Sequence, residues 1–141
     1  MKSIIPIPTE AEEQRALFEY ASYHPILKDY LIAIPNGGKR TKVNGYNMKM
    51  QGLKSGVPDI FLAYPSKNYH GLWIELKRNV KNVRISKNQS DWILRLSSKN
   101  YAAVVCKGKD NAIDILTRYL NNESFYTLQT LCIEVKNVEL L

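Results

Sequence analysis

Apolar and polar positions along the chain repeat with periods that predict helices in some segments and strands in others. The first helix is predicted to begin at Thr9, because Thr9 and Glu12 have the spacing of a capping box. At helical spacing one stripe of this helix is polar at its start and apolar at its end: Glu10, Gln14, Leu17 and Ala21. A purely structural helix has no need of the polar half, so this face is a candidate for function.

Four short apolar runs, each bounded by turn-forming residues, predict strands at residues 30–35, 60–64, 72–77 and 101–106. The second and third runs are separated only by the turn of residues 65–70, which favours a hairpin. A helix is predicted to start at Ser86, with a second capping box from Ser86 to Gln89. Asp110 is predicted to cap a last helix that runs through Leu120.

Two segments are harder to assign. Residues 39–56 are basic, polar and glycine-containing, which predicts a flexible loop that contains a helical turn, and so long a loop is more often functional than idle. Residues 125–135 are β-prone, but the pattern does not place them. The order of helices and strands predicts an α/β fold in which helices flank a mixed sheet.

Composition places the chain among globular proteins of a single domain. Its 141 residues are near the commonest domain size, and 45% of them are hydrophobic, which is enough for a core. Twenty Lys and Arg against 13 Asp and Glu give a net charge of +7, which suits a polyanionic partner such as nucleic acid. We expect residues 1–141 to form one domain, with a core at about 9–120 and a C-terminal extension at 121–141.

Cysteine and histidine usage argues against zinc and disulfide chemistry. Cys106 and Cys132 are the two cysteines, with no CxxC and no nearby pair of histidines. His24 and His70 lie beside Pro or Gly without a partner at ligand spacing, so both are interpreted as structural. The apolar stretch near Met1 is too short for a signal peptide, and no run long enough to span a membrane follows, so neither is expected. We expect an intracellular protein, of the bacterial cytoplasm or encoded by a phage, with no membrane partner.

The segment of residues 56–78 carries the candidate chemistry. Asp59 precedes one predicted strand, and Glu75 and Lys77 lie two apart on the next, so they share a face. A hairpin brings that face alongside Asp59, and two converging carboxylates repel unless a cation lies between them. Oxygen ligands without His or Cys favour Mg²⁺, with Mn²⁺ as a substitute, over zinc. The alternative is an ordinary surface ExK pair on an amphipathic strand.

An ordered set of motifs makes the chain resemble one family. Pro58-Asp59 followed by Glu75-x-Lys77 resembles the PD-(D/E)xK nuclease signature. The wider set resembles its virus-type replication-repair nuclease branch, the VRR-NUC domain: residues 34–40, 54–59, 71–77, Ser86-x-x-Gln89-x-x-Trp92, residues 101–106 and Gly108. The resemblance runs from about residue 9 to residue 120. It implies a restriction-endonuclease-like core and a metal-dependent DNA endonuclease.

Site residues follow from the resemblance. It implies Asp59, Glu75 and the backbone carbonyl of Leu76 as metal ligands, Lys77 as the catalytic lysine, and a glutamate of the first helix near the metal. Glu10 is our choice for that glutamate, and Glu13, on nearly the same face, is the alternative. Gln89 resembles the glutamine that supports such sites, although helix capping alone would also explain it.

A group of basic residues in one segment favours contacts with the DNA backbone: Lys39, Arg40, Lys42, Lys49 and Lys54. No motif for reading bases is evident, so recognition by DNA shape is expected. The leading hypothesis is a structure-selective, homodimeric endonuclease that acts on branched or duplex DNA and resembles Holliday-junction resolvases of DNA repair. The alternatives are a flap- or end-processing nuclease of a larger repair or packaging assembly, and a catalytically inert DNA-binding module.

Overall fold

A four-stranded mixed sheet forms the centre of the protein. The computed structural model describes residues 4–35, 42–123 and 138–140. In the sheet the strands follow the order β1-β2-β3-β5: Leu31–Ala33, Ile60–Leu62, Leu72–Lys77 and Ala102–Lys107. The first two pairings are antiparallel and the last is parallel. The predicted hairpin between residues 60 and 77 is therefore confirmed, as is the mixed α/β class.

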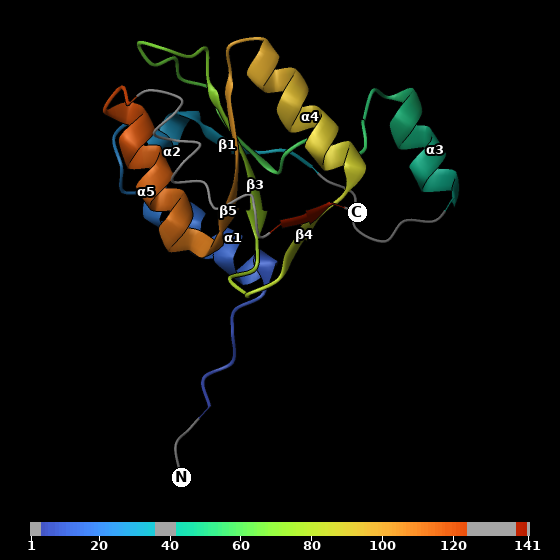
Figure 1. Ribbon diagram of the computed structural model, residues 1–141, viewed down its shortest axis with the longest axis horizontal. Coiled ribbons are helices and arrows are strands. Elements are labelled where there is room, and N and C mark those ends of the chain that lie inside the picture. Colours follow the sequence, from blue (N-terminus) through green and yellow to red (C-terminus); the bar gives the residue numbers. More distant parts are fainter. Residues whose placement is uncertain (1–3, 36–41, 124–137, 141) are drawn as a thin grey trace.

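Helices cover the two faces of the sheet unequally (Figure 1). On one side lie α1 (Glu10–Ala21), the short α2 (Leu27–Tyr30) and α5 (Gly108–Leu120), and on the other lies α4 (Lys87–Ser98). Beyond α4 stands α3 (Lys42–Met50), which is well separated from the sheet. Of the described helices, none is long and apolar enough to cross a membrane.

The hydrophobic core lies between the sheet and the helices α1 and α5. Alternation along β3 sends Leu72, Ile74 and Leu76 into this core, and each is at most 1% exposed. Leu17 and Ala21 from the apolar half of α1 meet them, as the helical stripe predicted. Cys106, on β5, is fully buried in this core. His24 is structural as interpreted, because its Nδ1 accepts backbone N–H bonds from residues 26 and 27.

Helix starts follow the capping signals in two cases and depart from them in a third. Thr9 Oγ1 accepts from the Glu12 N–H, and Ser86 and Gln89 form the full capping box of α4. The predicted cap at Asp110 is wrong: α5 begins two residues earlier, at Gly108, and Asp110 lies within its first turn. The reason is tertiary, because the Glu13 carboxylate from α1 accepts the Lys109 N–H and so caps α5 from outside.

Two further predictions are corrected. The segment expected to be a flexible loop with a helical turn contains the nine-residue α3, Lys42–Met50, although Gly45 and the two Asn of this helix have low helix propensity. A strand that sequence did not predict, β4 (Val83–Ile85), pairs in parallel with β6 (Val138–Leu140) near the chain end. Residues 125–135, the strand of uncertain place, lie outside the described residues.

Candidate active site

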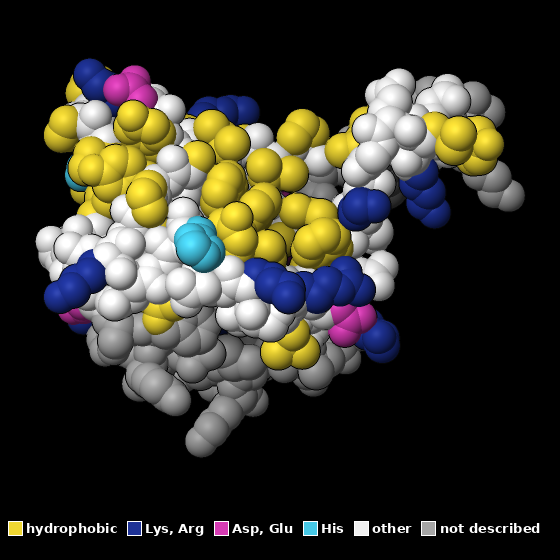
Figure 2. All heavy atoms as spheres, turned by 90° about the horizontal axis from the view of Figure 1, so that it is seen from above, with side chains coloured by type: hydrophobic (Ala, Val, Ile, Leu, Met, Phe, Trp, Pro, Cys, Tyr) yellow, Lys and Arg dark blue, Asp and Glu magenta, His cyan; other side chains and the backbone are white. Residues whose placement is uncertain are grey.

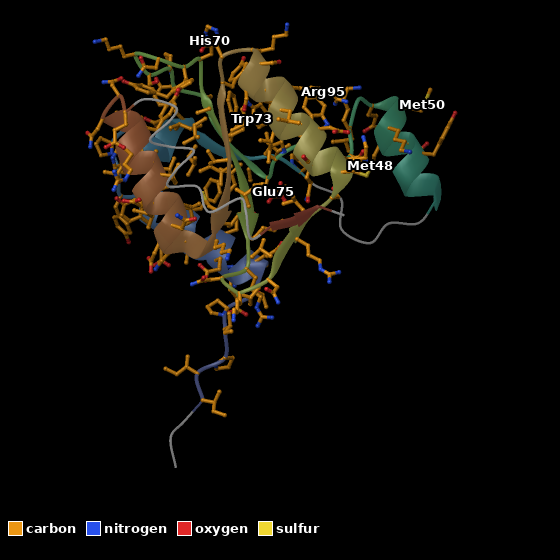
Figure 3. All side chains as sticks on the ribbon, viewed as in Figure 1. Met48, Met50, His70, Trp73, Glu75 and Arg95 are labelled. Carbon is orange, nitrogen blue, oxygen red and sulfur yellow. The ribbon has the colours of Figure 1, made fainter. Side chains whose placement is uncertain are left out.

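The strand β3 presents Glu75 and Lys77 on the face opposite the core, as their spacing predicted. Asp59 stands just before β2, and its Oδ2 accepts the Leu76 N–H at 3.0 Å. This bond fixes the carboxylate against the backbone of β3, next to Glu75. In Figure 3 Glu75 lies at the sheet beside α4, with Trp73 further along the strand. The hairpin thus brings together two carboxylates that are well separated in sequence.

Glu75 is a carboxyl group in an unusual environment. It is only 2% exposed, and its Oε2 is buried without a hydrogen-bond donor among the described residues. Burial, followed by the negative charge of Asp59, raises the pKa of Glu75 to about 8, although Lys77 acts in the opposite direction. The two carboxyl groups also share a hydrogen bond when one of them holds a proton. Burial and the negative charge of Asp59 together therefore outweigh the Lys77 ammonium, whose Nζ lies 3.5 Å from Glu75 Oε1.

Gln89 connects the parts of this site. Its Nε2 donates to Glu75 Oε1 at 2.9 Å, and its Oε1 accepts from Lys77 Nζ at 3.4 Å. The same Oε1 accepts the Ser86 N–H at 2.8 Å, which is half of the capping box. Because the cap fixes the amide oxygen, the amide nitrogen must face Glu75. Capping and support of the site are therefore one arrangement rather than two alternatives.

Lys77 is largely enclosed. Its side chain is 14% exposed, and Nζ lies 3.5 Å from Glu75 Oε1. With Nζ also bonded to Gln89, the ammonium is held at the edge of the carboxylate pair and does not extend into solvent. An ordinary surface ExK pair would have both side chains exposed, so that alternative does not fit the burial.

The two glutamates considered on α1 lie in different places. Glu10 lines a hollow of about 280 Å³ together with Lys77, Arg78, Val80, Asn82, Val83 and Arg84. Glu13 instead faces the start of α5, where Gly108 adopts φ +76 and an added Cβ would lie 3.3 Å from Glu13 Oε2. Among the described residues no three Asp, Glu, His or Cys side chains form a group that could hold a metal. Glu10 is thus near Lys77, but it does not complete a three-carboxylate group with Asp59 and Glu75.

Arg78 is a residue of the site that the sequence pattern did not reveal. Its guanidinium donates to the carbonyl oxygens of Ile7 and Pro8, at 2.8 and 3.1 Å, and so holds the segment that leads into Glu10. The signal available in the sequence was a second basic residue directly after Lys77. Adjacency in a strand predicts the opposite face, so the link to the N-terminal segment could not be foreseen.

The predicted DNA-binding residues are only partly placed. Lys49 and Lys54 line a hollow of about 430 Å³ between α3 and α4. Lys42 is the first residue of α3, and its side chain is outside the described part of the structure. Lys39 and Arg40 lie outside the described residues. Figure 2 shows α3 as a lobe that stands away from the main body, with Lys and Arg side chains beside the junction.

The donor set fits a hard divalent cation. Two carboxylates converge here, and Glu75 Oε2 is buried without a donor among the described residues. A positive charge there would offset both causes of the raised pKa of Glu75, its burial and the charge of Asp59. In a strand the N–H and C=O of one residue point to the same edge, so the Leu76 carbonyl is on the side of Asp59. Carboxylate and carbonyl oxygens without nitrogen or sulfur are the ligands of Mg²⁺ and Mn²⁺.

Comparisons with known proteins agree with this geometry. The sequence profile of the VRR-NUC domain matches residues 28–110, which is more than half of the chain. A solved structure described as a VRR_NUC domain protein is similar over 84% of this chain and 93% of its own, with 28% identity and a TM-score of 0.72. No curated protein matches the chain.

Proposed function

Because the chain belongs to the VRR-NUC family, a nuclease-type family, we propose that it is a Mg²⁺-dependent endonuclease that hydrolyses phosphodiester bonds in branched DNA. The observation that carries the proposal is the buried Glu75 carboxylate, which interacts with Asp59. Its Oε2 has no hydrogen-bond donor among the described residues, and its Oε1 is held by Gln89 and Lys77. A protein that only bound DNA would gain nothing from burying this pair, because burial of a charged carboxylate is costly.

Each residue then has a distinct task. Asp59, Glu75 and the Leu76 carbonyl would hold the cation, which polarises a phosphoryl oxygen and makes water nucleophilic when bound. Lys77 holds its ammonium next to Glu75, where it offsets negative charge that develops on the phosphorus during attack. Gln89 fixes Glu75 and Lys77 relative to each other before substrate arrives, so the site needs little rearrangement. Glu10, across the hollow from Lys77, would approach the bound water or cation.

The whole chain supplies the attraction to DNA. A net charge of +7 favours any polyanion, and Lys49 and Lys54 lie exposed near α4. These contacts recognise the phosphate backbone and carry no base information. Selection among DNA structures would then depend on the shape of the substrate.

One assay tests the function directly. The pure protein is incubated with labelled four-way junction, flap and linear duplex, each in Mg²⁺ and in EDTA. We expect cleavage of the junction in Mg²⁺ alone. Cleavage mainly of flaps would favour the end-processing alternative, and binding without any cleavage in Mg²⁺ or Mn²⁺ would favour the inert DNA-binding module.

A homodimer is part of the proposal. A domain of this size has one Asp59–Glu75 pair, whereas resolving a four-way junction requires cuts on two strands, and a two-fold dimer matches the symmetry of that substrate. Sedimentation at micromolar concentration measures the assembly, and a supercoiled cruciform plasmid shows whether the two cuts are coupled. A monomer that leaves mostly nicked circles would rule out the resolvase and leave the flap nuclease.

A further inference from the structure

A second hollow lies beside the candidate active site, between α4 and the segment that contains α3. Its volume is about 430 Å³, and the residues that line it are Lys49, Leu53, Lys54, Ser55, Asn88, Asp91, Trp92 and Arg95. Asn88, Trp92 and Arg95 are spaced so that they share one side of α4. In Figure 3 Arg95 extends from the side of α4 that faces α3, away from Glu75.

The hollow contains a flat, cationic surface. The Arg95 guanidinium lies 5.1 Å from the centroid of the Trp92 ring, in the arrangement of a cation–π pair. Trp92 is only half-buried and Arg95 is exposed, so these planes are open to the hollow. Both an indole ring and a guanidinium plane are surfaces on which nucleobases stack.

Charge in the hollow is positive. Lys49, Lys54 and Arg95 carry three positive charges, and Asp91 is the one acidic residue of the lining. Asp91 is already neutralised from outside, because its Oδ2 lies 2.9 Å from Lys87 Nζ. A small anion would need only the cations, and an apolar ligand would displace water from these charges without replacing its hydrogen bonds. A nucleotide uses both features, since its base stacks and its phosphate binds the ammonium groups.

The hollow is joined to the active site through two connections. Asn88, in its wall, precedes Gln89, whose amide holds Glu75. On the other wall Ser55, a few residues before Asp59, accepts a hydrogen bond from Asn88 Nδ2 at 3.2 Å. Gly56 makes this contact close: it adopts φ +87, and an added Cβ would lie 2.5 Å from the Asn88 carbonyl carbon. Both walls of the hollow therefore belong to chain segments that also carry active-site residues, Gln89 on α4 and Asp59 after Ser55.

We infer that this hollow binds an unpaired nucleotide of the DNA strand, with its base stacked on the Arg95–Trp92 pair and its phosphates at Lys49 and Lys54. This inference rests on the proposed nuclease function and adds to it the part of the substrate that is recognised. In the interior of a duplex both faces of every base are covered by neighbouring bases, so such a base cannot stack here, whereas an unpaired nucleotide can. Branch points, flaps and junction centres supply such nucleotides, which gives a physical basis for structure selectivity.

Fluorescence of Trp92 tests the inference without cleavage. The chain has two tryptophans, so in Trp73→Phe the signal comes from Trp92 alone. In EDTA, oligothymidylate should quench this signal, whereas the same oligomer with abasic sites, which keeps the phosphates, should not. In Trp92→Phe, where only Trp73 emits, the same titration should leave the signal nearly unchanged.

Affinity measurements complete the test. Trp92→Ala should weaken binding of oligothymidylate by about five- to a hundredfold, the size of one base stack, while affinity for blunt duplex stays within about twofold. Trp92→Phe keeps an aromatic plane and should weaken binding less. Leu94→Ala is the matched control, because Leu94 is on the same helix and is 66% exposed but does not line the hollow.

The outcomes separate this inference from the proposed function. Equal quenching by the abasic oligomer, or equal weakening of duplex and single-strand binding in Trp92→Ala, would overturn the stacking site even if the wild type cleaves junctions. If oligothymidylate quenches Trp92 only when its bases are present, but the wild-type protein cleaves no DNA, the stacking site would be supported and only the nuclease function would be overturned.

Discussion

The two faces of β3 differ more than any other neighbouring regions of the molecule. On one face Leu72, Ile74 and Leu76 are fully packed against α1 and α5. On the other face Trp73 and Glu75 each bury a polar atom that has no hydrogen-bond partner among the described residues, Nε1 and Oε2. The apolar face is completely packed, whereas the polar face holds two buried atoms whose hydrogen bonds are not made within the described residues.

This difference separates stability from function along a single strand. A packed apolar face contributes free energy of folding, whereas a buried carboxylate oxygen without a donor, such as Glu75 Oε2, costs free energy unless a ligand supplies the missing partner. Buried carboxyl groups with incomplete hydrogen bonding and a shifted pKa are typical of sites that bind a cation or substrate. The sheet is thus stabilised by the residues at even positions of β3 and prepared for chemistry by those at odd positions.

Substitution on the polar face should have the largest effect, and on activity alone. Lys77→Met removes the ammonium and keeps much of the side-chain volume, and Asp59→Asn removes one of the two charges of the carboxylate pair. Each should lower the cleavage rate on the order of a hundredfold or more, as removal of a group that stabilises developing charge does. DNA binding, measured by filter retention or anisotropy, should survive, and wild-type cleavage by Lys77→Met would refute its assigned role.

Substitution on the apolar face should act on stability. Ile74 is 0% exposed, so Ile74→Ala should reduce the free energy of unfolding by about 2–5 kcal/mol through reduced burial and the remaining cavity. Trp73→Phe, next in sequence but on the other face, is the control. Its ring still stacks on Phe61, whose centroid lies 4.2 Å from that of Trp73, so a smaller decrease is expected in urea denaturation. Equal decreases in the free energy of unfolding for Ile74→Ala and Trp73→Phe would contradict the view that the apolar face carries more of the stability.

The Glu75 carboxyl makes stability depend on pH. The folded protein holds a proton on Glu75 up to its pKa of about 8, whereas the unfolded chain releases it near 4.5. Between these values the folded state binds more protons, so the free energy of unfolding of the metal-free protein should fall as pH rises, by up to about 1.4 kcal/mol per pH unit.

Glu75→Gln provides the comparison for this slope. It cannot titrate, so its unfolding free energy in EDTA should be flatter from pH 5 to 8 by that amount, as urea denaturation can show. Mg²⁺ should stabilise the wild type more at pH 8 than at pH 6, because its ligands must release the proton first. Identical pH dependence of the two proteins would contradict the raised pKa.

The smallest predicted effect concerns the basic segment before and within α3. Replacing Lys39, Arg40 and Lys42 together by Ala should weaken binding to all DNA alike. The slope of log affinity against log salt should become less steep by about one unit for each phosphate that the variant no longer neutralises. These substitutions lie outside the sheet, so the free energy of unfolding in urea should be unchanged and serves as the control. An unchanged slope would assign these three residues to solvated surface charge.

The sequence alone determined much of this architecture. Period-two alternation placed Glu75 and Lys77 on one face of β3, and local capping chemistry fixed the start of α4 at Ser86 and Gln89. The hairpin and the convergence of Asp59 on Glu75 followed from these patterns, because one short turn joins the two strands. The mixed α/β class followed from the order of the helices and strands. These predictions agree with the structure because local geometry determines them.

Tertiary structure decided what depends on distant partners. The start of α5 moved to Gly108 because Glu13, 96 residues before Lys109, caps it, and a local rule at Asp110 could not include that residue. The same contact separates Glu13 from Glu10, which helical spacing alone left as alternatives. The Arg95–Trp92 pair faces a hollow only because Ser55 and Gly56 close on Asn88. Periodicity defines which residues share a face, but only packing determines what that face meets.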